Sequence, residues 1–560
     1  MGKILTLHDP HSAREHYLSG AWRQDTMYSL LCKHAADRGG AFALRDPYQR
    51  LTWAQVLARV DRVAEDLHSS GLRGGDRVSV WLPNRVEAVV ILLACSRNGY
   101  VCNTSLHQNY TVQEVIELAE SIECSALFAQ IDYGADADRH DVFAACRQLP
   151  SMRVMYALAG PKDAPVRLDG CRGLPNGPAS SVGPAPVADP DKVVYLAFTS
   201  GTTGKPKGVM HSDNTLLANG RAMVADWGHN EQTILLSLSP LSHHIGTVAL
   251  EQSLVSGCEL VVTDGRAGIK TLDWIEQTQA TYVMGVPTHA MDLLHAMQQR
   301  GQPGLGRVSI FYMAGAPIPR ELASRFLQLG ITPQNIYGMT ENGSHQYTHP
   351  TDNATTITAT CGRSCHGYEV KLWKQDNPDA EADPGEVGEI GGRGGLLMLG
   401  YYSNQKATES AFNAHGWFMS GDLGRLDQQG NLQIVGRKKD LIIRGGHNIH
   451  PTRIENLALR HPDVAKAAVF PVPDERLGEK ACLAIVAQSG TPTGEALLAH
   501  LNEVGLSKYD MPEYFVVLSE FPLTASGKIL KRELVAWSAA GRIQPQPVRW
   551  QAKEGPSHEH

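Results

Sequence analysis

The chain lacks any apolar run long enough to cross a membrane. Its longest, Ala88–Cys95, has eight residues, whereas a membrane-spanning helix needs about 20. The first residues, Met1–His8, lack the apolar core of a signal peptide. Basic residues are not in excess either, since 51 Lys and Arg face 58 Asp and Glu for a net charge of −7. We therefore expect no transmembrane segment and no nucleic acid as a partner.

Cysteine is sparse and shows no pattern of pairing. There are ten cysteines in 560 residues, and Cys361 and Cys365 form a close pair that lacks the second pair of a zinc site. Scattered thiols of this kind indicate a reducing compartment, so we expect a cytoplasmic protein. A chain of this length is too long for one hydrophobic core and predicts two or more domains.

Helical patterns alternate with short apolar runs, which favours an α/β fold with mostly parallel strands. Helices are expected at Trp53–Leu67 and Val86–Cys95, and strands at Arg77–Leu82, Ile234–Leu238, Glu259–Val262, Tyr282–Val286 and Val308–Met313. The character changes around Gly436–Asp440, after which a shorter unit carries strands at Ala467–Val472 and Ala481–Val486. We predict a large domain at 1–438, a small α+β domain at 439–540 and a tail at 541–560.

One glycine-rich stretch is the most informative part of the chain. It reads Thr199-Ser-Gly-Thr-Thr-Gly-Lys-Pro-Lys-Gly208 and follows the strand-like run Val193–Phe198. Glycines let backbone N–H groups turn toward an anion, while hydroxyls and lysines add donors and charge. The residues predicted to hold phosphate are Thr199, Ser200, Gly201, Thr202, Thr203, Gly204 and Lys205. The spacing is too short for a Walker A loop, and Pro206 stands where that loop has Ser or Thr.

This decapeptide resembles the signature loop of the adenylate-forming enzymes: acyl- and aryl-CoA synthetases, peptide-synthetase adenylation domains and luciferases. Five further segments follow in the family's order as far as Lys528, and Gly75–Asn84 looks like an early family segment. The resemblance therefore covers nearly the whole chain. It implies a large domain of sheets flanked by helices, a β-barrel-like subdomain and a small mobile C-terminal domain.

The segment Pro240–Gly246 is similar to one that borders the carboxylate pocket in acyl- and aryl-CoA synthetases. The resemblance aligns His243 with the bordering residue and assigns it a catalytic role. Peptide-synthetase domains usually carry an aspartate nearby, and its absence from Ser242–Ile245 disfavours amino-acid substrates. By motif position the acyl pocket contains Trp227, His243, Gly285, Gly338, Met339 and Gly343, with Gly246, Gly315, Ser344 and His345 beside them.

Two later segments supply candidates for nucleotide and metal binding. Small residues at Gly315, Ala316 and Pro317 follow a predicted strand, where a flat purine can lie against the backbone, and Tyr337 is placed to stack on it. Adenylyl transfer needs a hard cation, and one carboxylate together with the substrate can hold Mg²⁺. We assign Glu341 to Mg²⁺ and Thr340 to the phosphate, and count both as catalytic.

The next segments are expected to complete the ATP site. A carboxylate can accept two hydrogen bonds from the adjacent hydroxyls of a ribose, so Asp422 is the predicted ribose ligand and Arg437 a second contact. The loop Pro522–Ile529 resembles the one that carries the family's C-terminal catalytic lysine. It implies that Lys528 neutralises charge between the acyl carboxylate and the α-phosphate.

The family's reaction implies two half-reactions in one pocket. A carboxylate attacks MgATP to give acyl-AMP and pyrophosphate, and a thiol then attacks the acyl-AMP. The small domain is expected to rotate about Lys439 between them, exchanging Lys528 for the segment of Arg444, Gly445 and Gly446 that opens the thiol channel. The predicted thiol is coenzyme A, with a free carrier protein left open.

Several glycines and no obvious Arg or Lys in the pocket favour a roomy site for an apolar monocarboxylate. The run Gly338–Tyr347 resembles that of bacterial medium-chain and cyclohexanecarboxylate-type CoA ligases, while benzoate- or cinnamate-like acids and bulky ring-bearing acids fit almost as well. His447 and the stretch Asn103–Asn109 depart from the usual family pattern and leave subfamily and substrate open. A carrier-loading enzyme, an aryl-CoA ligase and a degenerate sensor are the alternatives. A homodimer and acetylation of Lys528 by a lysine acetyltransferase are further predictions.

Overall fold

The computed structural model describes residues 4–163, 167–175, 183–199, 206–316, 318–488, 490–523 and 529–550. The chain forms two compact units. The larger contains residues 1–371, 391–418 and 430–432, and the smaller contains 372–390, 419–429 and 433–560. Because the units interleave along the chain, the predicted division at residue 439 stays a prediction. No helix within the described ranges is both long and apolar enough to cross a membrane.

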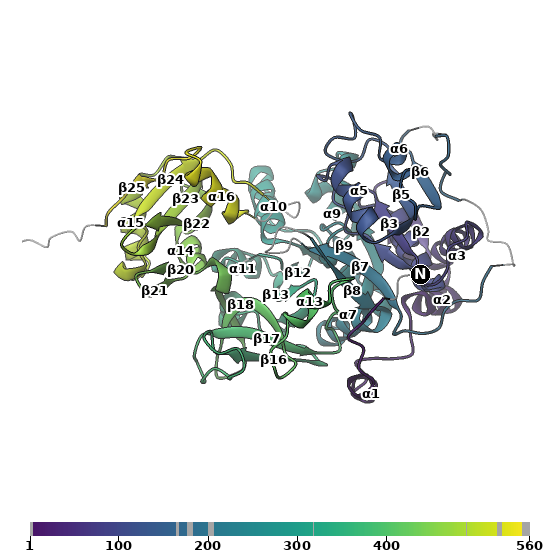
Figure 1. Cartoon of the computed structure of the whole chain (residues 1–560), viewed down its shortest axis with the longest axis horizontal. Helices are drawn as coiled ribbons and strands as arrows, with labels where there is room; N and C mark the ends of the chain where they lie inside the picture. The colour runs from purple at the N-terminus through teal and green to yellow at the C-terminus, as the bar shows by residue number, and fades with distance from the viewer. Residues whose placement is uncertain are drawn as a thin grey trace, which may run out of the picture. The chain divides into compact units, whose positions relative to one another are not determined.

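The largest sheet lies in the larger unit and has nine strands in the order β15-β14-β13-β12-β11-β9-β10-β1-β2; Figure 1 labels β2, β9, β12 and β13 of this sheet. Neighbours from β13 to β1 run parallel, whereas β2, β14 and β15 pair antiparallel. Its strands are β1 Phe42–Arg45, β2 Arg50–Thr52, β9 Ile234–Ser237, β10 Glu259–Val262, β11 Tyr282–Gly285, β12 Ile310–Met313, β13 Thr332–Met339, β14 Gly343–Tyr347 and β15 Arg363–Ser364.

A second sheet of the larger unit has six strands in the order β6-β5-β3-β4-β7-β8, all parallel except the last pair. Its strands are β3 Arg77–Trp81, β4 Val101–Asn103, β5 Cys124–Gln130, β6 Val154–Leu158, β7 Val193–Thr199 and β8 Lys207–Ser212. Every residue of β3 and β5 is buried, as expected of parallel strands covered on both faces. In Figure 1, α5 and α6 lie over β5 and β6, and their apolar side chains share one core with β5.

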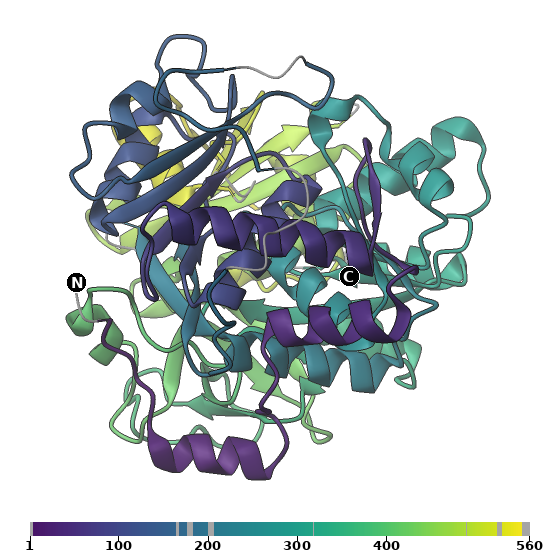
Figure 2. The same cartoon turned by 90° about the vertical axis from the view of Figure 1, so that its right-hand side faces the viewer.

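Helices cover both sheets of the larger unit. The α2 and α3 helices lie side by side, in purple in Figure 2. The α4 helix is buried along nearly its whole length, which explains its long apolar run. The helices are α1 Pro10–Leu18, α2 Met27–Arg38, α3 Trp53–Ser69, α4 Val86–Asn98, α5 Val112–Ser121, α6 Val142–Cys146, α7 Asp213–Trp227, α8 His244–Ser256, α9 Thr271–Thr278, α10 Pro287–Arg300, α11 Arg320–Gln328, α12 Ala354–Ala359 and α13 Gln405–Glu409.

Two further sheets complete the fold. One has the order β16-β17-β18-β19, with β16 Tyr368–Trp373, β17 Gly388–Gly394, β18 Phe418–Leu426 and β19 Leu432–Arg437. The other lies in the smaller unit in the order β21-β20-β23-β24-β25, with β22 on β23. Its elements are β20 Ile442–Arg444, β21 His447–Ile449, α14 Pro451–Ala458, β22 Val464–Asp474, β23 Gly478–Ala487, α15 Gly494–Glu503, β24 Tyr514–Leu518, α16 Lys531–Ala539 and β25 Gln546–Pro547. The predicted α/β class is confirmed.

Candidate active site

Four of the predicted motif segments follow four neighbouring strands of the nine-stranded sheet. Pro240–Gly246 follows β9, Gly285 ends β11, Gly315 follows β12, and Tyr337–Glu341 ends β13. These strands are adjacent and parallel, so their carboxyl ends meet at one edge of the sheet. Open α/β sheets bind ligands at such an edge.

The edge is closely packed. A Cβ on Gly315 would lie 3.5 Å from the Cγ1 of Val286 and 3.6 Å from the Cδ1 of Ile245. The segments after β9, β11 and β12 therefore come close together at Gly315, whose φ of +86° favours a glycine. Ala316 beside it is exposed, and Pro317 lies outside the described residues.

Close packing explains three glycines of this region. A Cβ on Gly338 would collide with the carbonyl of Gly343, and one on Gly246 with the carbonyl of Pro240. A Cβ on Gly343 would lie 2.7 Å from the Oδ1 of Asn219. The expectation that these glycines leave a roomy pocket is therefore wrong at all three positions.

Thr340 and Glu341 form the turn between β13 and β14, and two side chains that sequence reasoning missed hold this turn. The hydroxyl of Tyr401 donates to the carboxylate of Glu341 at 2.9 Å. The Nε2 of His211 lies 2.7 Å from the carbonyl oxygen of Thr340. Because a carbonyl only accepts, Nε2 carries the proton and Nδ1 accepts from Thr215 at 3.0 Å.

A strap formed by residues 398–402, which contains Tyr401, also connects this turn to the end of the phosphate loop. Residues 398–402 bond Glu341 through the N–H of Met398 and bond Gly208 on β8 through the N–H of Tyr402. The ammonium of Lys207 lies over the ring of Tyr401, 4.8 Å from its centroid. Thr199 ends β7 and pairs with Lys207 across the hairpin, while Ser200–Lys205 lie outside the described residues. The structure therefore joins the base of the glycine-rich loop to Glu341 through Tyr401.

Two pairs of histidine rings stack at the start of α8. The ring of His243 stacks on His107 with centroids 4.4 Å apart, and His244 stacks on His211 at 5.4 Å. Burial lowers the pKa of His107 and of His211 to about 4, and that of His244 to about 3. These three rings are therefore neutral near pH 7.

Other predicted pocket residues lie in the same unit. Trp227 is the buried last residue of α7, and Met339 is fixed by a hydrogen bond from its N–H to Asn342 at 3.1 Å. Tyr337 is buried with its ring edge-on to His345, the centroids 5.4 Å apart.

In the smaller unit the structure brings Asp422 and Arg437 together. Their side chains form an ion pair at 2.9 Å, with the carboxylate nearly buried and the guanidinium half-exposed. Arg444 pairs with Glu513 and also bonds the carbonyl of Tyr509, so an anion would have to compete for it. Gly445 and Gly446 form the turn between β20 and β21 with positive φ. Lys439 lies in a short 3₁₀ turn, Lys438–Asp440, and Lys528 lies outside the described residues.

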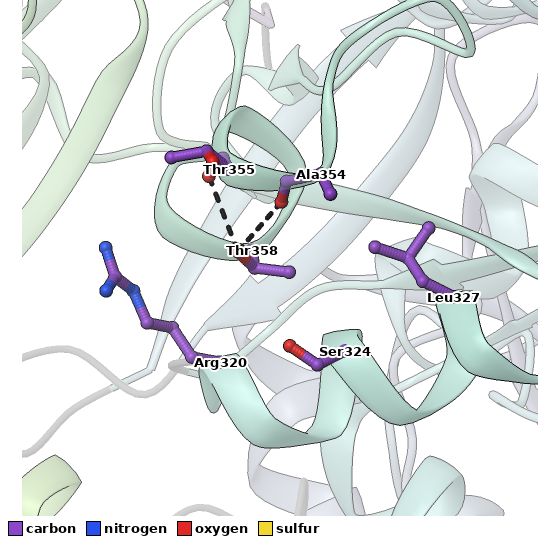
Figure 3. Close-up of a pocket in the computed structure, with 6 residues that line it drawn as sticks. All are labelled: Arg320, Ser324, Leu327, Ala354, Thr355 and Thr358. Carbon is purple, nitrogen blue, oxygen red and sulfur yellow. Dashed lines mark hydrogen bonds between the residues drawn. The ribbon is translucent and has the colours of Figure 1, made fainter.

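A surface depression between α11 and α12 is a separate feature (Figure 3). Thr358 lines it, and the hydroxyl of Thr358 bonds the carbonyls of Ala354 and Thr355 within its own helix. The lining residues are Arg320, Ser324, Leu327, Ala354, Thr355 and Thr358. None of these residues comes from the segments that the motifs single out.

Comparison with known proteins gives two family matches. The model of the AMP-binding enzymes matches residues 31–402, and the model of the AMP-binding enzyme C-terminal domain matches residues 453–528. A medium-chain fatty-acid–CoA ligase of Escherichia coli (strain K12) is 31% identical over 467 residues, which are 83% of this chain and 81% of that protein. A salicylyl-CoA synthase/salicylate adenylyltransferase of a Streptomyces species is 30% identical over 94% of this chain and 96% of its own.

Solved structures agree with these matches. ATP-bound MatB from Rhodopseudomonas palustris superposes with a TM-score of 0.79 at 26% identity, covering 92% of this chain and 99% of that one. The o-succinylbenzoate CoA synthetase MenE from Bacillus subtilis, in complex with an acyl-adenylate intermediate, gives a TM-score of 0.75 at 27% identity over 91% of this chain and 98% of its own. Both match nearly their whole length, so the likeness includes both units.

Proposed function

The chain belongs to the AMP-binding enzyme family, and we propose from this premise that it activates an apolar monocarboxylic acid of medium-chain, alicyclic or other ring-bearing type. It is an AMP-forming carboxylate–CoA ligase that uses ATP and CoA. The observation that supports the site assignment is the meeting of four motif segments at the carboxyl edge of β9, β11, β12 and β13, with Glu341 tied to the phosphate-loop hairpin through Tyr401.

The reaction has two steps. A carboxylate oxygen of the acid forms a bond to the α-phosphorus of ATP, and the bond to pyrophosphate breaks. The sulfur of CoA then bonds the acyl carbon, AMP leaves, and the thiol proton passes to solvent. We assign His243 to the border of the carboxylate pocket, Thr340 to the phosphate, and Lys528 to the charge that develops during the first step.

Glu341 fits a magnesium site of the kind that one carboxylate and the substrate complete. Its carboxylate accepts a hydrogen bond from Tyr401, and carboxylate oxygens are ligands that Mg²⁺ prefers. Among the described residues no group of three or more His, Cys, Asp or Glu could hold a metal ion. Mg²⁺ would neutralise phosphate charge during adenylyl transfer.

The class of acid is inferred from two kinds of evidence. Relatives at 31% and 29% identity are named medium-chain ligases, and the motif segments contain the apolar residues Ile245 in α8 and Met339 at the end of β13. A relative at 27% identity is named 2,3-dihydroxybenzoate–AMP ligase, which keeps an aryl acid as the second candidate. Loading of a carrier protein is the alternative to CoA.

The remaining assignments stay proposals. They are rotation of the smaller domain about Lys439, a CoA channel at Arg444–Gly446, ribose binding by Asp422 and Arg437, a homodimer, acetylation of Lys528, and a cytoplasmic location. All ten cysteines are free thiols, as in a reducing compartment. Opening the channel would require Arg444 to exchange its contact with Glu513 for the ligand.

Pyrophosphate release tests the proposal. The acids are butyrate to laurate, cyclohexanecarboxylate, benzoate, salicylate and a polycyclic acid, each with and without CoA and beside Lys528→Ala. We expect turnover that needs CoA and one class of apolar acid, and a loss of about 10²-fold or more in the variant, as for other charge-stabilising groups. Preference for salicylate would favour the aryl acid, and pyrophosphate without CoA-dependent turnover would favour a carrier protein. An enzyme that binds ATP but releases no pyrophosphate with any acid would contradict the proposal.

A further inference from the structure

His107 lies in the stretch Asn103–Asn109 that departs from the usual family pattern, and it contacts the predicted acid-binding residue directly. Its ring stacks on that of His243 with centroids 4.4 Å apart and planes 30° apart. Stacked aromatic rings at such a distance stabilise each other in addition to the stabilisation from the surface that they bury. The stretch Asn103–Asn109, which has no assigned function, therefore contacts the residue proposed to border the carboxylate of the acid.

The position of His107 is fixed from three sides. The indole N–H of Trp81 donates to its backbone carbonyl at 2.9 Å. The ring of Tyr110 lies edge-on to it at 5.1 Å, and its Nδ1 lies 3.2 Å from the hydroxyl of Ser242. His107 is only 8% exposed, so its ring has little freedom to turn.

His243 sits where the chain changes direction. It precedes the first residue of α8, and its backbone is fixed by bonds from its N–H to Pro240 and from the N–H of Gly246 to its carbonyl, both at 2.9 Å. These bonds fix the Cα of His243 but leave its side-chain torsions to its neighbours. The flat face of His107 is a neighbour that can select one orientation of the ring.

We propose that His107 is a positioning residue, which holds the ring of His243 in the plane needed beside the carboxylate of the acid and thereby sets the apparent affinity for that acid. The inference rests on the proposed function, because it requires an acid next to His243. It predicts that His107 affects the acid more than ATP.

The test measures ATP–pyrophosphate exchange while acid and ATP are varied in turn, so that a KM is obtained for each. His107→Ala should raise the KM for the acid about twofold to tenfold, the fold-change that an aromatic pair accounts for, with the KM for ATP changed less than about twofold. His107→Phe keeps the ring and should remain near wild type. His107→Gln keeps a polar group without the ring and should behave like His107→Ala.

The matched control is His500→Ala. His500 packs against His461 in the smaller unit, with centroids 5.1 Å apart. This variant therefore removes one ring of a histidine pair that does not include His243, and we expect no change in the KM for the acid. Unfolding temperatures are measured for all variants. If His107→Ala does not fold, the comparison of His107→Phe with His107→Gln decides.

An unchanged KM for the acid in folded His107→Ala would overturn the proposal. So would a wild-type KM in His107→Gln together with a raised KM in His107→Phe, because that result would assign the effect to the contact with Ser242. Either result would leave the ligase assignment intact, because wild type would still exchange pyrophosphate. If the wild-type enzyme showed no pyrophosphate exchange with any of the acids, both the proposed function and this inference would be overturned.

Discussion

Tyr401 provides the sharpest test of how the site is built. Its hydroxyl donates to the carboxylate of Glu341 at 2.9 Å, and its ring lies under the ammonium of Lys207. Burial, together with the charge of Glu341, raises the pKa of Tyr401 far above neutral, so the phenol remains a donor at every working pH. Tyr401→Phe removes this donor while keeping the ring that contacts Lys207.

The expected effect follows from the kind of hydrogen bond that is lost. A bond to a charged acceptor contributes about 1.5–3 kcal/mol, but Glu341 is only half-buried, so water can replace part of it. We therefore expect a loss of about 1–2 kcal/mol in transition-state stabilisation. This corresponds to a fall of roughly tenfold in kcat/KM for MgATP.

The assay is the initial rate of pyrophosphate release at saturating acid and CoA, with MgATP varied. Tyr402→Phe is the control, because Tyr402 joins the same strap through its backbone N–H, which bonds Gly208, and the substitution leaves that bond intact. If Tyr401→Phe kept full kcat/KM, or if Tyr402→Phe lost as much, Tyr401 would not position Glu341. A rise in kcat/KM would show that the hydroxyl competes with Mg²⁺ for the carboxylate, which also contradicts the argument.

Two further predictions concern stability. Burial lowers the pKa of His211 from 6.5 to about 4, so the unfolded chain binds more protons than the folded protein between these two pH values. The stabilisation is therefore complete above pH 6.5 and is lost as the pH falls toward 4. The free energy of unfolding should fall by up to about 3 kcal/mol for each such histidine. Unfolding temperatures from pH 7.5 to 4 should show this fall, and a flat profile would contradict it. Gly338→Ala should destabilise by more than about 2 kcal/mol, since its Cβ would collide with the carbonyl of Gly343. Gly40→Ala is the control, because no described heavy atom lies within 4 Å of the added Cβ, and equal unfolding free energies for the two variants would refute the steric argument.

Local pattern was sufficient for most of the elements. The expected strand Glu259–Val262 is β10 to the residue, and the helix expected at Trp53–Leu67 is α3, Trp53–Ser69. These segments succeed because buried parallel strands and amphipathic helices carry their periodicity in consecutive residues. The helix expected at Val86–Cys95 likewise lies within α4, Val86–Asn98.

The contacts that hold the site could not be predicted in this way. Tyr401 lies 60 positions from Glu341, and His211 lies 129 positions from Thr340, so no local period links them. A tyrosine after a glycine or a histidine in a strand is more often a core residue than part of a site. The prediction of a roomy pocket from the glycines failed for a related reason. A missing side chain can leave empty space or can allow neighbouring atoms to come close, and only the packing distinguishes the two.

The arrangement of histidines links each of two proposed parts of the site, the one for ATP and the one for the acid, to a different segment of the chain. His211 bonds the turn of Thr340 and stacks on His244, whereas His107 stacks on His243, the adjacent residue. Two consecutive residues at the start of α8 are therefore held by two different segments, one on β8 beside the phosphate loop and one in the stretch after β4. A change at His211 should disturb the turn that carries Thr340 and Glu341, and thus slow adenylyl transfer from ATP to the same extent with every acid. A change at His107 should instead act on the proposed acid end, through its contact with His243. We therefore expect substitutions in the stretch 103–109 to alter the choice of acid while leaving adenylyl transfer intact.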